Sequence, residues 1–143
     1  MRDVVLDANV LVGLLDPNDT LHERAVRLRG ELEAAGDSPI IIDFLLEEAV
    51  SVLCRRAAQR RTNPPALARV HELVADWISN GLIETNPTGA FSLSDVLDIT
   101  FASQGRLNCN DAKLVLLQRQ GLIDLVATFD VELKAVEGFE SVG

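Results

Sequence analysis

Four acidic residues of this chain stand at the borders of apolar segments, where a carboxylate is costly to bury. They are Asp7, Glu48, Asp111 and Asp130. Acidic side chains are seldom fully buried without an opposite charge or a metal ion. Of the four, only Asp111 has a lysine or arginine within two positions, Lys113. The pattern therefore indicates that a divalent cation supplies the missing positive charge, and hard oxygen ligands favour magnesium or manganese.

A cluster of carboxylates around such an ion can hydrolyse phosphodiester bonds. The metal lowers the pKa of a bound water molecule and screens the charge of the scissile phosphate. Without a metal, clustered acids repel one another and raise their own pKa values. The alternative is a structural role, in which each acid serves as a helix cap or a loop residue. Asp111, in the first turn of a predicted helix, is open to that interpretation as well.

Alternating strands and helices must position these acids. Short apolar and β-branched runs predict strands at residues 3–7, 40–42, 82–85 and 125–128. Helices are predicted at residues 9–15, 20–35, 43–61, 65–80, 94–104 and 108–120. Thr20 (in a capping box with Glu23), Asp43, Ser94 and Asn108 are the predicted caps.

This alternation implies an α/β fold with a mostly parallel sheet. Ligands of such sheets gather at the carboxyl ends of the strands. Asp7 and Asp130 each lie at or just past the end of a predicted strand, and Asp111 lies at a helix start that favours an anion. We therefore expect the acids to share one pocket at this edge of the sheet.

Periodicity does not decide which of two adjacent glutamates faces that pocket. Glu47 and Glu48 flank the apolar face of their helix at similar angles. The centre of that face runs through Leu46, Ala49, Val50 and Leu53. Spacing alone leaves both glutamates as candidates.

Length and composition set further bounds. The 143 residues suit one domain, taken as residues 1–143, and the hydrophobic content of 48% provides a sizeable core. No apolar run approaches the length of a membrane span, and the first residues lack a signal-peptide pattern. We expect a cytoplasmic protein that does not enter a membrane.

The charge balance argues against a broadly basic nucleic-acid-binding surface. The net charge is −9, whereas phosphate contacts need lysine and arginine. One local exception consists of Arg55, Arg56, Arg60 and Arg61, which are four of the thirteen basic residues. They form either a solvated helix face or an edge that contacts RNA phosphates beside Glu48.

Four segments of the sequence resemble the motifs of PIN-domain ribonucleases. They are residues 4–12 (VVLDANVLV), 46–49 (LEEA), 110–112 (NDA) and 127–130 (ATFD). Their order and spacing most resemble a VapC-type toxin of a toxin–antitoxin pair. The resemblance extends from Val4 to about Leu133.

The resemblance implies a PIN-like three-layer α/β/α sandwich with a mostly parallel central sheet. It also implies an endoribonuclease dependent on Mg²⁺ or Mn²⁺. The catalytic, metal-binding acids carried over from the family are Asp7, Glu48, Asp111 and Asp130. The family pattern thereby selects Glu48 over Glu47, and it matches Asn9 and Thr128 to supporting polar positions.

A VapC-type toxin would form a homodimer and be held inactive by a cognate antitoxin, whose tail enters the acidic site. An arginine on that tail would complement the carboxylates. Two alternatives remain open. One is a PIN-fold nuclease of RNA maturation or quality control without an antitoxin, and the other is a non-catalytic metal-binding α/β module.

Overall fold

Five parallel strands form the centre of the protein. The computed structural model describes residues 1–59, 62–86 and 89–143. Its strands are β1 (Asp3–Leu6), β2 (Ser38–Ile42), β3 (Ile83–Glu84), β4 (Leu125–Ala127) and β5 (Ser141–Val142), in the spatial order β3-β2-β1-β4-β5. Every neighbouring pair is parallel. Parallel strands need crossover connections, and helices provide them here.

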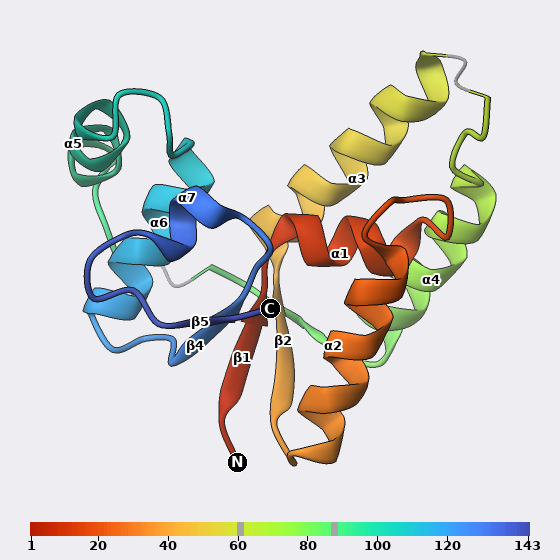
Figure 1. Ribbon diagram of the computed structural model, residues 1–143, viewed down its shortest axis with the longest axis horizontal. Helices are drawn as coiled ribbons and strands as arrows, with labels where there is room; N and C mark the ends of the chain where they lie inside the picture. The colour runs from red at the N-terminus through yellow and green to blue at the C-terminus, as the bar shows by residue number, and fades with distance from the viewer. Residues whose placement is uncertain (60–61, 87–88) are drawn as a thin grey trace.

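Helices cover the sheet on both sides. They are α1 (Ala8–Leu15), α2 (His22–Ala34), α3 (Asp43–Ala58), α4 (Leu67–Ser79), α5 (Leu93–Ala102), α6 (Cys109–Arg119) and α7 (Val131–Lys134). Figure 1 shows α1 to α4 gathered on one side of the sheet and α5 to α7 on the other. This arrangement confirms the predicted α/β/α sandwich. No helix in the described ranges is both long and apolar enough to cross a membrane.

The apolar residues of β1 and β4, the two strands that precede the first and last acids, are almost completely buried. Val4, Val5 and Leu6 are at most 2% exposed, and so are Val126 and Ala127. Each fully buried Val or Leu side chain stabilises the fold by about 1.5–3 kcal/mol. Burial on both faces explains why these strands read as continuous apolar runs. The same burial holds the two strands firmly in place, and with them the residues that follow their carboxyl ends, Asp7 and Asp130.

Two predicted helix caps are wrong. Thr20 does not cap α2, which begins at His22 without a side-chain cap, while Asp19 Oδ2 accepts a hydrogen bond from Leu21 N at 3.0 Å. Ser94 does not cap α5 either. Ser92 does so in a capping box with Asp95, two residues earlier than predicted.

The other caps agree more closely with prediction. Asn108 caps α6 as expected. Asp43 is the first residue of α3 rather than its cap, yet its Oδ1 accepts hydrogen bonds from the backbone N of Phe44 and of Asn86. The helix predicted to reach Arg61 ends at Ala58, and the last two residues of that prediction lie outside the described residues.

Helices α1 and α2 cross at a glycine. A Cβ atom built on Gly13 would lie 2.8 Å from the Ala25 Cβ and 3.2 Å from the Leu21 carbonyl oxygen. Since Ala25 is fully buried, it has no space to move. Gly13 thus allows the two helices to approach closely, which sets the position of α1 directly after Asp7.

We predict that Gly13→Ala lowers the free energy of unfolding by about 1–3 kcal/mol, because overpacking forces the helices apart. The matched control is Gly30→Ala in α2, where a Cβ would meet no atom within 4 Å. That substitution should stabilise the protein by up to about 1 kcal/mol through helix propensity. Urea denaturation of both variants measures the contrast. Equal effects at the two glycines would contradict the close approach.

Candidate active site

The four predicted acids line one cavity of about 270 Å³. Asp7 caps α1 directly after β1, and Asp130 caps α7 three residues after β4. Glu48 comes from α3 and Asp111 from the first turn of α6. Four elements therefore bring their acids to the carboxyl edge of the two central strands. Glu47 is exposed and does not line this cavity, so the structure separates the two glutamates that helical phase left equivalent.

Asp7 is held by hydrogen bonds at both carboxylate oxygens. Its Oδ1 accepts from Ala8 N at 2.7 Å, and its Oδ2 accepts from Thr128 Oγ1 at 2.7 Å. Asn9 Nδ2 donates to the same Oδ2 at 3.4 Å and to Thr128 Oγ1 at 3.3 Å. Asn9 Oδ1 in turn accepts from Phe129 N at 3.1 Å. Asn9 and Thr128 thus join the start of α1 to the end of β4.

Thr128 also reaches the last acid. Its Oγ1 accepts a hydrogen bond from Asp130 N at 3.0 Å, and its side chain is completely buried. Asp130 Oδ1 accepts from Glu132 N at 2.9 Å, which caps the short helix α7. One threonine hydroxyl therefore positions Asp7 and Asp130 relative to each other.

Two asparagines hold Glu48, a role that no sequence pattern indicates. Asn108 Nδ2 donates to Glu48 Oε1 at 3.3 Å, and Asn110 Nδ2 donates to Oε2 at 3.1 Å. Asn108 Oδ1 simultaneously accepts from Asp111 N at 2.8 Å, while Asp111 Oδ2 accepts from Asn108 N at 2.9 Å. A helix cap was expected at Asn108. Its bond to a glutamate 60 positions away depends on tertiary packing and has no local sequence signal.

Asp111 therefore satisfies both interpretations of its position. It completes the capping box of α6, as the structural interpretation expected. It is also only 7% exposed and lines the acidic cavity. A residue that only caps a helix is normally solvated, so this burial beside three other acids calls for a further role.

Burial raises the pKa values of two of these acids. Loss of solvent raises the pKa of Asp7 to about 6, against the lowering effect of its hydrogen bonds from Thr128 and Ala8, and the charges of Glu48 and Asp130 raise it further. Loss of solvent likewise raises the pKa of Asp111 to about 7, with added repulsion from the other three acids. The cavity thus favours proton uptake or a cation.

The donor chemistry of the cavity fits a hard divalent cation, because carboxylate oxygens dominate its polar lining. In the described ranges, however, no three Asp, Glu, His or Cys side chains are arranged as they stand to hold one metal ion. Hydrogen bonds already engage each of the four carboxylates. A metal ion would have to compete with those local donors.

Of the four arginines predicted to contact RNA phosphates, one lines the acidic cavity in the described ranges, and it already forms ion pairs. Arg56 lines the acidic cavity, but its Nη1 lies 2.7 Å from Asp19 Oδ1 and 3.2 Å from Asp16 Oδ2. Arg55 is exposed. Arg60 and Arg61 lie outside the described residues. Within the part of the chain that the structure describes, Arg56 is the one cation lining the cavity, and two aspartates already engage its guanidinium.

Comparisons with known proteins support the fold. The sequence matches no protein-family profile and no curated protein. Among solved structures, it is similar to VapC20 of Mycobacterium tuberculosis, a sarcin–ricin loop cleaving toxin, with a TM-score of 0.62, 19% identity, and coverage of 97% of this chain and 98% of that one. It is also similar to PAE2754 of Pyrobaculum aerophilum, with a TM-score of 0.60, 20% identity, and coverage of 99% and 84%. The chain therefore has the PIN-like fold that the sequence motifs implied.

We predict that Asp111→Asn becomes progressively more stable relative to the unchanged protein as pH rises from about 4 to about 7 in metal-free buffer. The carboxyl of Asp111 keeps its proton up to about pH 7 when folded but loses it near 3.8 when unfolded. The stability that this proton contributes is present below about pH 4 and lost as pH rises through about 7. Asparagine does not titrate in this range.

Urea denaturation of both proteins at several pH values, with a chelator present, tests this expectation. Each pKa unit corresponds to about 1.4 kcal/mol, so the change should reach a few kcal/mol across the range. A difference in stability that stays constant between these pH values would contradict the raised pKa.

Proposed function

We propose that this chain is a metal-dependent endoribonuclease that acts as the toxin of a toxin–antitoxin pair. The observation that carries the proposal is the convergence of Asp7, Glu48, Asp111 and Asp130 on one cavity at the carboxyl edge of the sheet. The likeness in fold to a toxin that cleaves RNA supports the same class of reaction.

In this proposal the four acids hold magnesium or manganese. The ion would screen the scissile phosphate and lower the pKa of a water molecule that attacks it. Asp7 offers the most closely held carboxylate, because each of its oxygens accepts a hydrogen bond at 2.7 Å, from Ala8 N and from Thr128 Oγ1, whereas the bonds to Glu48 are 3.1 and 3.3 Å long. Asp111 has to release its proton, whose pKa is about 7, before it can bind a cation. Metal affinity should therefore rise with pH.

The proposal includes protein partners and a place of action. A homodimer, a cognate antitoxin and a cytoplasmic location belong to the toxin class that the sequence resembles. The unbalanced negative charge of the acidic cavity suits an arginine on the antitoxin tail, because guanidinium and carboxylate form strong charge-assisted hydrogen bonds.

We predict that Glu48→Gln abolishes metal-dependent cleavage of RNA, whereas Glu47→Gln retains it. The two substitutions remove the same charge at adjacent positions of α3, but only Glu48 lines the cavity. The assay mixes purified protein with total RNA in manganese or magnesium and maps the cleaved ends. Asp111→Asn should also be inactive without a loss of metal-free stability, because asparagine keeps an oxygen for the Asn108 backbone N–H.

Several results would count against the function. They are cleavage that persists in chelator, activity that survives Glu48→Gln, or an Asp111→Asn variant that is active but destabilised. The last result would leave Asp111 with only its role at the helix start. A melting temperature that did not rise in millimolar manganese would argue against the metal site, since a ligand of the folded state stabilises it.

We predict a separate role for Asn108 in positioning Glu48. Asn108→Ser keeps an oxygen that caps α6 but removes the amide that donates to Glu48. Cleavage should fall by about 10–100-fold at nearly unchanged stability. Ser92→Ala is the control, since it removes the corresponding cap of α5 outside this cavity. It should cost about 1 kcal/mol and keep cleavage. Full activity of Asn108→Ser would limit Asn108 to capping.

A further inference from the structure

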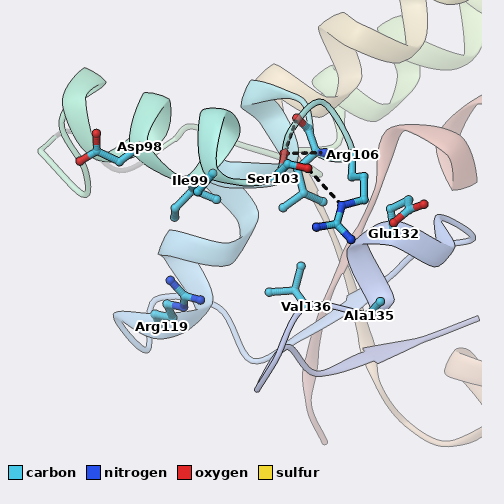
Figure 2. A pocket seen from close by; sticks show the side chains of 10 residues that line it. Asp98, Ile99, Ser103, Arg106, Arg119, Glu132, Ala135 and Val136 are labelled. Carbon is cyan, nitrogen blue, oxygen red and sulfur yellow. Dashed lines mark hydrogen bonds between the residues drawn. The ribbon is translucent and has the colours of Figure 1, made fainter.

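A second cavity, of about 450 Å³, lies between α5, α6 and α7 (Figure 2). Its lining has two kinds of surface. Two arginines, Arg106 from the α5–α6 loop and Arg119 from the last turn of α6, contribute guanidinium groups. Ile99, Leu107 and Val136 contribute apolar surface. Cations beside apolar surface can receive a group with both a charged and a flat apolar part.

This cavity adjoins the acidic one along two stretches of chain. Arg106 and Leu107 line the second cavity, while the next residue, Asn108, lines the acidic cavity. Asp130 lines the acidic cavity, while Glu132 lines the second. Two residues of chain span at most about 7 Å. The two cavities are therefore separated by these short stretches of chain.

The two arginines are available to an anion. Arg106 Nε donates a hydrogen bond to the Ser103 carbonyl oxygen at 3.1 Å. This bond orients the guanidinium group, and the N–H groups of its two terminal nitrogens remain for a ligand. In the described ranges, neither Arg106 nor Arg119 lies within 4.0 Å of a carboxylate oxygen. Four other arginines do form such ion pairs, namely Arg2, Arg29, Arg56 and Arg69. The guanidinium groups of Arg106 and Arg119 therefore share one cavity without an ion pair among the described residues.

We propose that this second cavity is a nucleotide-binding subsite for the RNA that the acidic cavity cleaves. The inference rests on the proposed function. Arg106 and Arg119 bind phosphates beside the scissile one, because guanidinium groups recognise phosphate through several hydrogen bonds. A base packs on the apolar surface, which removes its flat faces from water.

The remaining charges of the cavity favour a nucleotide over a free phosphate ion. Glu132 also lines it, and an ion without hydrogen-bond donors would meet only repulsion from this carboxylate, whereas Asp98 directs its carboxylate away from the other labelled side chains (Figure 2). A carboxylate can instead accept hydrogen bonds from a ribose 2′-hydroxyl or a base amino group. Two cations, the Glu132 carboxylate as an acceptor and an apolar surface together match a ribonucleotide within a chain.

The test measures binding of a labelled single-stranded RNA to the Asp111→Asn protein in manganese, so that the RNA stays intact. Arg106→Gln/Arg119→Gln should weaken binding by about tenfold or more, since hydrogen bonds to charged groups contribute that much. The slope of log affinity against log salt should fall by about 0.7 for each phosphate that is no longer bound. The charge-matched control is Arg29→Gln/Arg69→Gln, two exposed arginines on α2 and α4. It should leave both quantities nearly unchanged.

Failure of the subsite can be told apart from failure of the function by also assaying cleavage with Asp111 restored. If the protein cleaves RNA while the Arg106/Arg119 variant binds RNA like the control, the subsite is overturned and the nuclease stands. The same conclusion follows if that variant changes only the oligomeric state, because the cavity is then a protein interface. If the unchanged protein neither binds nor cleaves RNA, the subsite and the function both fall.

Discussion

The hydrogen bond from the Thr128 hydroxyl to Asp7 is the interaction on which the site depends. Strands β1 and β4 are neighbours, with Leu6 paired to Ala127, so their next residues leave the sheet side by side. Asp7 N also donates to the Ala127 carbonyl oxygen at 2.9 Å. A buried carboxylate without donors would be strongly unfavourable. The threonine provides a donor at 2.7 Å and fixes the first acid to the rigid centre of the sheet.

The central elements could be predicted from the sequence because their signals are local and agree with their burial. The apolar runs at residues 3–7 and 125–128 became β1 and β4, and the short strand at 82–85 became β3. The caps were less reliable, since Ser92 and Ser94 both suit the start of α5 and loop geometry decides between them. Strand β5 was missed because Ser141 and Val142 show no alternating or apolar run. Pairing with β4 alone makes them a strand.

The acids of the site were predictable, but the contacts that orient them were not. Asp7 and Asp130 follow from their places at strand ends. Helical phase could not decide between Glu47 and Glu48. The family pattern selected Glu48, and in the structure Glu48 lines the acidic cavity whereas Glu47 does not. The amides of Asn108 and Asn110 reach Glu48 from about 60 positions away, so their role appears only once α3 and α6 are packed together.

The sheet ends on both sides in a strand of two residues, β3 and β5. An edge strand is normally a template to which another chain can add its own backbone. Two residues provide too few unpaired amide and carbonyl groups to hold an added strand firmly. Any protein that binds this one, including a second copy, therefore has little to gain from extending the sheet. Its contacts fall instead on side chains of the helices and of the acidic cavity, whose shape and charge can distinguish one partner from another.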